Sequence, residues 1–170
     1  EEKLARDLYL AFYEQFGTPA FRNIAAAEQR HMASVLVLMD RYGLNDPAGN
    51  SGPGLFADPE LATLYEQLLA QGSASLSEAL RVAAAVEEID ILDLQESLAR
   101  TDKVDISRVY QNLLAGSVNH LRAYSSLWER QTGQEYAAQH LDAGAYEELL
   151  GENGRRPGQR RGGRGAGRGR

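Results

Sequence analysis

The sequence predicts an all-α protein, built as a bundle of four long helices with a long connection between the second and the third. Three observations lead to this prediction. Apolar residues recur at steps of three and four along four stretches of the chain, which is the spacing of one helix face. Glycine, proline and small polar residues stand between these stretches, where helices begin and end. Polar residues also stand in the middle of the apolar faces, as they do in bundles that hold a site between their helices.

The first two helices are predicted at residues 1–16 and 19–42. Between them, Gly17 suits the residue that follows a helix, Thr18 suits an N-cap, and Pro19 suits the first position of the next helix. A connection this short makes two helices antiparallel neighbours. The beginning of the chain therefore predicts a helical hairpin.

A connection of 33 residues, 43–75, leads to the third long helix. It combines a loop rich in Gly, Pro and Asn with a short helix at about 59–71. An up-and-down bundle needs only a short link at this place. The length therefore favours a crossover that lets the third long helix run parallel to the second.

The third and fourth long helices are predicted at about 76–100 and 106–131. Ser75 or Ser77 can cap the third helix, and Asp105 can cap the fourth.

The charge divides the chain into two parts. The net charge of −6 combines +6 on residues 151–170, which hold seven arginines and Glu152, with −12 on residues 1–150. We expect residues 1–150 to form the helical domain, with 135–150 as a short helical or irregular segment packed on the bundle. Residues 151–170 are expected to be a disordered Arg/Gly-rich tail. Such a tail can make weak contact with nucleic acid or another anionic surface through residues 155–170, or it can simply aid solubility.

Some classes of protein are excluded by what the sequence lacks. It has no run of about 18 apolar residues, so no membrane-spanning helix is expected. It has no cysteine, so disulfides and thiolate ligands are excluded, and any metal ligands must be carboxylates and histidines. The chain begins at Glu1, without Met and inside a predicted helix, as a truncated or processed chain would. A prokaryotic cytoplasm and export therefore both remain open.

Glu28 and His31 stand in the middle of the apolar face of the second helix. The other members of this face are Phe21, Ile24, Val35, Leu38 and Tyr42. An unpaired carboxylate or imidazole in a protein core costs several kcal/mol of folding free energy. The two residues can be satisfied as a buried ion pair, as a pair on the helix surface, or by a metal ion.

Two further helices carry polar groups at comparable places. Glu87 lies on the apolar face of the third long helix, and Ser117 and His120 lie on that of the fourth. Small residues at 115–117 would also let helices approach each other closely there. Polar groups of several helices are thus expected to meet in the core.

A weak internal repeat supports the same arrangement. It aligns the pair Glu1 and Glu2 with the pair Glu87 and Glu88, and it aligns the two histidines of the second and fourth helices. The simpler interpretation of the first pair is that acids are favoured at a helix N-terminus. The simpler interpretation of the second pair, together with Asp90, is a solvated acidic face.

Carboxylates that converge in a core repel one another, and their pKa values rise. Divalent cations remove this repulsion and bind through carboxylate oxygen and imidazole nitrogen. Without a metal, the acids would have to be protonated or paired with an arginine. The candidate arginines are Arg6, Arg30, Arg81 and Arg122.

Four stretches of the chain combine these polar residues with their helical surroundings: EEKLARDLY (1–9), FRNIAAAEQRHM (21–32), VEEIDILDL (86–94) and GSVNHLRAY (116–124). Together they resemble the ferritin-like di-iron carboxylate superfamily, and more narrowly the uncharacterised DUF2202 family. The first stretch is also similar to the first-helix pattern Glu-x-x-Ala-Arg-x-x-Tyr of rubrerythrins. The resemblance covers about residues 1–150 and implies a ferritin-like four-helix bundle.

The resemblance also implies a metal site, with a bridging glutamate from the third long helix. The other implied ligands are Glu2, Glu28, His31 and His120. For the bridge, the position on the apolar face favours Glu87, and the internal repeat favours Glu88. Ser117 departs from the superfamily pattern, which has a glutamate three residues before the last histidine. The site can therefore hold one ion or two, and Asp90 is a candidate to compensate.

The expected function is metal binding, with iron as the expected metal, manganese or zinc as alternatives, and redox chemistry with dioxygen or peroxide. The rival hypothesis is a non-enzymatic helical module whose Arg/Gly tail tethers it to an anionic partner. A homodimer is compatible with both. Four tyrosines could border the metal site but are expected to be core residues: Tyr9, Tyr13, Tyr110 and Tyr124.

Overall fold

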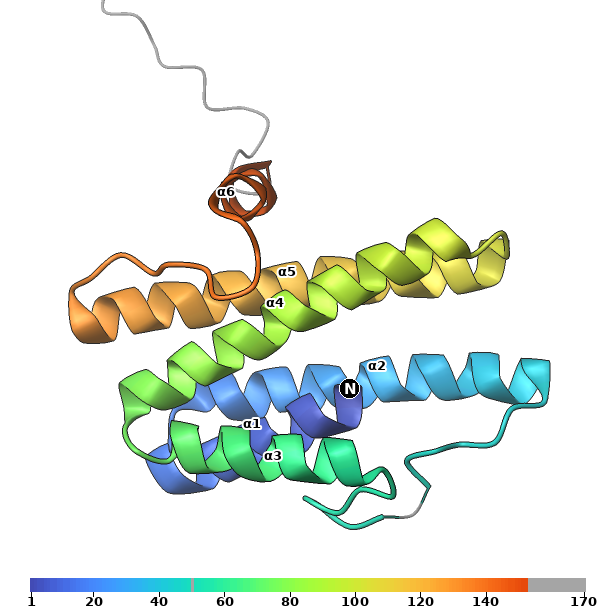
Figure 1. Cartoon of the computed structure of the whole chain (residues 1–170), viewed down its shortest axis with the longest axis horizontal. Coiled ribbons are helices and arrows are strands. Elements are labelled where there is room, and N and C mark those ends of the chain that lie inside the picture. The colour runs from blue at the N-terminus through green and yellow to red at the C-terminus, as the bar shows by residue number, and fades with distance from the viewer. Residues whose placement is uncertain (50, 153–170) are drawn as a thin grey trace, which may run out of the picture.

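Six helices and no strand make up the part of the chain that the structure, a computed structural model, describes, which is residues 1–49 and 51–152. The helices are α1 (Glu2–Phe16), α2 (Pro19–Tyr42), α3 (Pro59–Gly72), α4 (Leu76–Arg100), α5 (Val104–Thr132) and α6 (Ala143–Glu152) (Figure 1). The predicted all-α class is confirmed. None of these helices combines the length and apolarity that a membrane span needs. Residues 151 and 152, predicted as the start of the tail, belong to α6, and the rest of the predicted tail, 153–170, lies outside the described residues.

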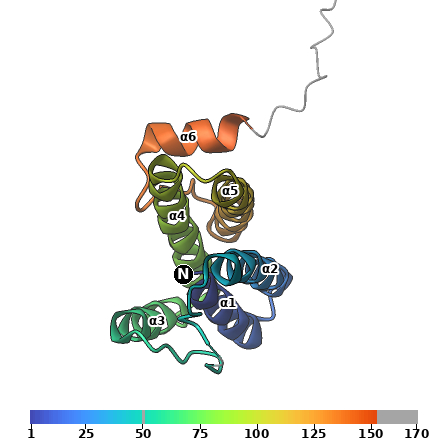
Figure 2. The same ribbon diagram turned by 90° about the vertical axis from the view of Figure 1, so that its right-hand side faces the viewer.

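The four long helices form two antiparallel hairpins. Gly17 and Thr18 join α1 to α2, and residues 101–103 join α4 to α5. Gly17 has a φ of 65°, the left-handed conformation that glycine adopts without strain at the end of a helix. The hairpins pack on each other through α2 against α5 and α1 against α4, as the view in Figure 2 shows.

The connection between the hairpins carries α3, which packs against α1 and α4. The loop before α3 is fastened to α1 by Lys3, a buried side chain. Its ammonium donates hydrogen bonds to Asp7 at 2.5 Å and to the carbonyl of Gly52 at 3.0 Å. With this crossover, α2 and α4 run in the same direction in Figure 1, as the length of the connection predicts.

The starts of α4 and α5 test the predicted caps. Ser75 caps α4, since its hydroxyl accepts a hydrogen bond from a backbone N–H of the first turn at 3.1 Å. The cap predicted for the fourth long helix is wrong. α5 begins two residues earlier, and Asp105, inside its first turn, accepts hydrogen bonds from Arg41 at 2.5 Å and Tyr42 at 3.0 Å. Asp105 therefore ties α5 to the end of α2.

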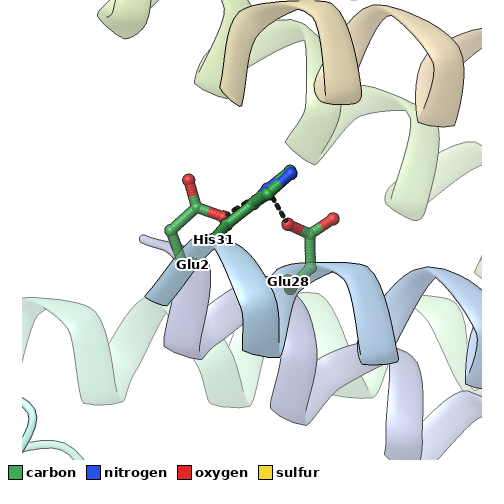
Figure 3. A group of neighbouring side chains, drawn as sticks. All are labelled: Glu2, Glu28 and His31. Carbon is green, nitrogen blue, oxygen red and sulfur yellow. Dashed lines mark hydrogen bonds and ion pairs between the residues drawn. The ribbon is translucent and has the colours of Figure 1, made fainter. Parts of the chain in front are cut away.

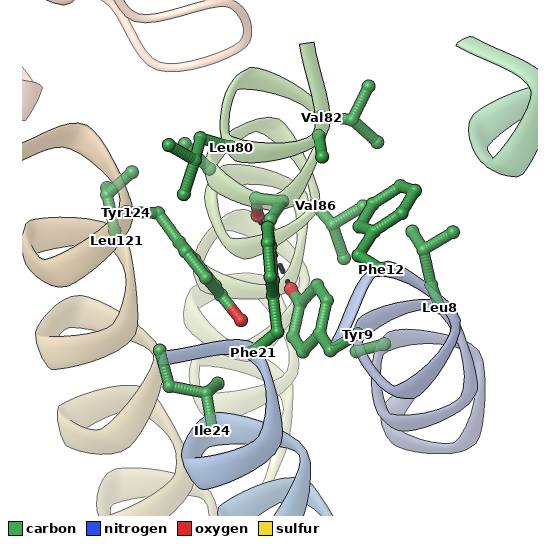
Figure 4. Packing of buried hydrophobic residues seen from close by; sticks show 14 of the residues in the cluster. Leu8, Tyr9, Phe12, Phe21, Ile24, Leu80, Val82, Val86, Leu121 and Tyr124 are labelled. Atoms are coloured by element: carbon green, nitrogen blue, oxygen red, sulfur yellow. Dashed lines mark hydrogen bonds between the residues drawn. The ribbon is translucent and has the colours of Figure 1, made fainter. Parts of the chain in front are cut away.

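Aromatic and aliphatic side chains fill the space where the hairpins meet (Figure 4). Tyr9, Phe12, Phe21 and Tyr124 are fully buried, and their rings contact in pairs with centroids 5.1 to 5.5 Å apart. Gly72, the last residue of α3, lies so close to Phe12 that a Cβ there would come within 2.1 Å of the ring. Burial of each such side chain stabilises the fold by about 1.5–3 kcal/mol. This core fixes the positions of α1, α2, α4 and α5 beside the polar cluster described next.

Candidate metal centre

Five of the six predicted ligands come together between the two hairpins, and each long helix contributes at least one. α1 provides Glu2, α2 provides Glu28 and His31, α4 provides Glu87, and α5 provides His120. Glu28 and Glu87 are each only 2% exposed, and His120 is 9% exposed. The four helices thus direct three carboxylates and two imidazoles at one largely buried place, and these five residues make up the polar cluster.

The first group of ligand atoms belongs to Glu2, Glu28 and His31 (Figure 3). His31 Nδ1 lies 3.1 Å from Glu2 Oε2 and 2.8 Å from Glu28 Oε2. Because Glu28 and His31 are three residues apart on α2, they share one helix face. Glu2 approaches the same imidazole from the first turn of α1.

The second group belongs to Glu28, Glu87 and His120. His120 Nδ1 lies 2.7 Å from Glu28 Oε1 and 3.4 Å from Glu87 Oε2. Within each group, the ligand atoms all lie within 4.8 Å of one another. Glu28 belongs to both groups, since one of its oxygens faces His31 and the other faces His120.

Two atoms of the second group are buried without a hydrogen bond. Among residues 1–49 and 51–152, Glu28 Oε1 and His120 Nδ1 have no partner in hydrogen-bonding geometry, although the two atoms are close to each other. At 2.7 Å the two atoms can attract each other as opposite charges, but the contact lacks the directional geometry of a hydrogen bond. A cation held by both atoms would satisfy both lone pairs, so the donor set fits a metal ion.

Gly116 makes room for His31. A Cβ at this position of α5 would lie 2.7 Å from both Cε1 and Nε2 of His31, closer than side chains tolerate. The imidazole of His31 therefore reaches the backbone of α5, where it stacks on His120 with ring centroids 5.6 Å apart. The small residues predicted to allow a close approach act here through this one glycine.

The charges of the cluster are strongly coupled. Burial raises the pKa values of Glu2 and Glu87 to about 7, and repulsion from Glu28 adds to the rise. Burial also acts to raise the pKa of Glu28, but the two neighbouring imidazoles have the larger effect and lower this pKa to about 2. Burial lowers the pKa values of His31 and His120, yet the carboxylates raise them to about 9 and about 10. Without a metal, both histidines are thus protonated at neutral pH and paired with Glu28.

Asp90 brings a further carboxylate to the edge of the cluster. The hydroxyl of Ser117 donates a hydrogen bond to Asp90 Oδ2, and Ser117 is fully buried. Burial raises the pKa of Asp90 to about 7, and the charges of Glu2 and Glu28 add to the rise. Ser117 of α5 therefore holds an acid supplied by α4.

Tyr9 orients one of the carboxylates. Its hydroxyl donates a hydrogen bond to Glu87 Oε1 at 2.7 Å, which leaves Glu87 Oε2 facing His120. A hydrogen bond of this kind fixes the direction of a ligand and tunes its basicity. The sequence places Tyr9 in the core, where it is fully buried, but does not reveal this contact, because the two residues belong to helices far apart in the chain.

Glu88, the sixth predicted ligand, is not brought to the cluster. Its buried carboxylate accepts hydrogen bonds from the hydroxyl of Tyr136 and from three backbone N–H groups, at 2.6 to 3.1 Å. These N–H groups belong to Gln139, His140 and Leu141. Successive residues of a helix point about 100° apart. Glu87 consequently faces the cluster, and Glu88 faces the segment that leads to α6.

A polar pocket of about 410 Å³ adjoins the cluster. Glu2 and Asp90 form part of its wall, together with three more acids, Glu1, Asp93 and Glu96, and with Arg100, which pairs with Glu96. Negative side chains in a cleft raise the local concentration of cations. The pocket is therefore a suitable path for a metal ion from solvent to the cluster.

Comparisons with known proteins agree on a single group of relatives. A family model described as "Uncharacterized protein domain (DUF2202)" matches residues 1–153. The uncharacterized protein MJ0754 of Methanocaldococcus jannaschii is 41% identical over 150 residues, which are 88% of this chain and 80% of that protein. A crystal structure of the hypothetical protein MJ0754 from Methanococcus jannaschii matches with a TM-score of 0.84 and 40% identity, over 88% of this chain and 85% of that chain. These names state no activity.

Proposed function

The chain belongs to the DUF2202 family, and from this premise we propose that it is a ferritin-like four-helix bundle that binds iron and uses it in redox chemistry with dioxygen or peroxide. The proposed ligands are Glu2, Glu28, His31, Glu87 and His120. The observation that carries the proposal is that two groups of ligand atoms share Glu28 in a buried place. Structural cores rarely gather so many ionisable groups, and perturbed, buried clusters of this kind are typical of functional sites.

The shared carboxylate supports a site for two ions. Each group offers one imidazole nitrogen and two carboxylates, and Glu28 offers a different oxygen to each histidine. Asp90 can supply one more carboxylate, next to Ser117. A bridge through Glu28 and a supplementary acid from α4 would replace the second bridging glutamate of the superfamily pattern.

The donor set favours first-row metals over calcium or magnesium, because it includes two imidazoles and lacks backbone carbonyl ligands. Bound iron would supply one-electron oxidation and reduction, whereas bound zinc would supply only Lewis-acid chemistry. The chain itself would provide the geometry. Tyr9 orients Glu87, Gly116 leaves room for His31, and the aromatic core excludes water from one side of the cluster.

The competing explanation is that the cluster is satisfied internally, by protonated histidines paired with Glu28. Two features favour a bound metal over internal pairing. Glu28 Oε1 and His120 Nδ1 lack hydrogen-bonding geometry despite their proximity. Three further acids, Glu2, Glu87 and Asp90, must in addition keep protons at a pH where free carboxyl groups are ionised.

The test is an anaerobic titration of the purified full chain with Fe(II), Mn(II) and Zn(II), combined with elemental analysis of protein isolated from cells grown with iron. We expect up to two ions per chain, a higher melting temperature on binding, and oxidation of bound Fe(II) by dioxygen or peroxide. Glu28→Gln should lose both ions, because it removes the shared carboxylate with little change in volume. Glu66→Gln, on the exposed face of α3, is the matched control and should bind as the parent does.

The proposal would be ruled out if the isolated protein carried no stoichiometric metal and none of the three ions changed its melting temperature. A chain shortened to residues 1–152 separates the rival hypothesis. If the shortened chain loses binding to anionic polymers and neither form binds metal, the tethering module is the better explanation.

A further inference from the structure

A second, apolar cavity of about 50 Å³ lies between α1, α3 and α4 and is partly open to solvent, since Leu64 on its wall is 39% exposed. Three leucines of α3, Leu61, Leu64 and Leu68, form one wall. Leu4 of α1 and Val86 and Ile89 of α4 form the other, and Glu1 and Asp90 complete the lining. The crossover helix, which contributes no ligand to the cluster, thus forms one wall of a small, mainly apolar space.

The lining decides what this cavity can hold. A water molecule is well held only by about two to four polar partners, and six of the eight lining side chains, all leucine, valine or isoleucine, offer none. Replacing a poorly held water by an apolar molecule is favourable, and apolar cavities take up small species such as xenon. The volume admits a molecule of a few atoms and excludes a fatty acid or an aromatic substrate.

Asp90 connects this cavity to the cluster. It lines the apolar cavity, and it also lines the acidic pocket together with Glu2. Its carboxylate accepts the hydrogen bond of Ser117, one helical turn before His120 on α5. A small molecule in the cavity is therefore separated from the cluster by the Asp90 side chain and its immediate neighbours.

The two spaces differ in what they attract. The acidic pocket suits cations and polar molecules such as hydrogen peroxide, because its wall carries five carboxylates and a single guanidinium, that of Arg100. The leucine-lined cavity suits an uncharged, apolar molecule. The smallest apolar oxidant that ferrous iron reduces is dioxygen.

We propose that the cavity bounded by Leu61, Leu64 and Leu68 binds dioxygen and delivers it to the cluster past Asp90. The inference rests on the proposed function, because it names the oxidant and its path. Two ferrous ions, if held by the cluster, would supply the two electrons that convert dioxygen and two protons to hydrogen peroxide, and would themselves become ferric. The crossover between the two hairpins then has a function of its own, which is to form the wall of the dioxygen pocket.

The first test uses xenon as an apolar probe on the metal-free full chain. Xenon under pressure should shift the methyl NMR signals of Leu61, Leu68 and Ile89 in a saturable way. Leu64→Phe should abolish these shifts, because the larger ring fills the cavity. Leu92→Phe is the matched control, since Leu64 and Leu92 are both 39% exposed and Leu92 does not line the cavity. Leu68→Phe is a second filling variant, in case the new ring at residue 64 turns to solvent.

The second test measures the rate at which dioxygen and, separately, hydrogen peroxide oxidise the Fe(II)-loaded protein. Filling the cavity should lower the rate with dioxygen roughly fivefold or more and leave the rate with peroxide unchanged. Leu92→Phe should leave both rates unchanged. Anaerobic Fe(II) binding is measured on every variant, so that loss of metal is distinguished from loss of access.

Each outcome decides the proposal. Methyl shifts with xenon together with a selective loss of the dioxygen rate support it. If xenon causes no methyl shifts, the cavity does not bind an apolar gas. If a filled variant is slowed equally with both oxidants, or excludes xenon without being slowed, the cavity is not the path by which dioxygen reaches the cluster. If the parent binds no Fe(II), the proposed function and the delivery role fail together, while the xenon result still decides whether the cavity takes up an apolar gas.

Discussion

A side chain on residue 116 and the imidazole of His31 cannot occupy the same space between α5 and α2. A Cβ on Gly116 would lie 2.7 Å from two atoms of the His31 ring, and the ring is held on its other side by Glu2 and Glu28. The absence of a side chain on one helix thus determines where a candidate ligand of another helix can lie.

Gly116→Ala is therefore expected to displace His31 without unfolding the chain. Alanine favours a helix by about 1 kcal/mol over glycine, which offsets part of the strain. The apparent affinity for Fe(II) should fall by about tenfold or more, the size of effect seen when a ligand loses its orientation. Circular dichroism and the anaerobic titration measure the two quantities.

Gly151→Ala is the control for this change. Gly151 lies in α6, and a Cβ there would meet nothing within 4 Å, so the variant should keep the affinity of the parent. An unchanged affinity in Gly116→Ala would contradict the role assigned to this glycine.

The adjacent residues Glu87 and Glu88 should respond in opposite ways to the same substitution. Glu87→Gln removes a carboxylate that faces His120, so metal binding should weaken by about tenfold or more while the fold is kept. Glu88→Gln removes the charge that accepts four hydrogen-bond donors, three of them backbone N–H groups of residues 139–141. Hydrogen bonds to charged groups contribute about 1.5–3 kcal/mol, so this variant should be less stable to urea by about 2–4 kcal/mol yet bind metal normally. Metal loss in Glu88→Gln at a temperature where it is folded would refute this division of roles.

These two residues also show how far the sequence alone could lead. Helical spacing predicted α1, α2, α3 and α4 to within one residue at each end, and it placed Glu87 on the face that meets the cluster. The internal repeat favoured Glu88, but the repeat compares letters and does not register which way a side chain points. The partners of Glu88 lie about fifty residues further along the chain, in a segment with no periodic pattern, so they could not be predicted.

A similar limit explains the other differences between the sequence predictions and the structure. Asp105 has the right chemistry for a cap, and only the position of Arg41 and Tyr42 on the neighbouring helix turns it to another use. Asp90 and Ser117 could each be noted as unusual, but their hydrogen bond depends on how α4 and α5 pack. Sequence periodicity thus predicts the face of a helix, whereas contacts across helices depend on packing that the pattern does not contain.

Tyr9→Phe is expected to loosen Glu87. The variant deletes the hydroxyl that donates to Glu87 Oε1 and leaves a buried acceptor unsatisfied, so stability should fall by about 1–3 kcal/mol. Metal affinity should fall as well, because the carboxylate loses its fixed direction. Tyr124→Phe is a close control, since the Tyr124 hydroxyl is buried without a hydrogen-bond partner among the described residues. Equal losses of stability in the two variants would show that the hydrogen bond to Glu87 contributes nothing.

The last prediction concerns pH, because most of the shifted pKa values act in one direction. The folded pKa values of His31 and His120, about 9 and about 10, lie above the ordinary value of 6.5. The stability that these two histidines contribute is fully present below the unfolded pKa and is lost as the pH rises through the folded values. Glu2, Glu87 and Asp90, each raised to about 7, act likewise, because the folded chain binds their protons more tightly. Glu28, lowered to about 2, contributes stability that is lost only in acid.

The metal-free protein should therefore become less stable from about pH 5 to about pH 10, since the folded state binds more protons than the unfolded state over this range. We expect its melting temperature to fall by about 5 °C or more between about pH 6 and about pH 9. Metal binding must displace the same protons, so the affinity for Fe(II) or Zn(II) should rise over that range. The double variant His31→Gln, His120→Gln serves as the control, because it should lose the part of the stability change that falls above about pH 7. A metal-free melting temperature that stays constant or increases from about pH 6 to about pH 9 would mean that the histidines do not carry the protons assigned to them.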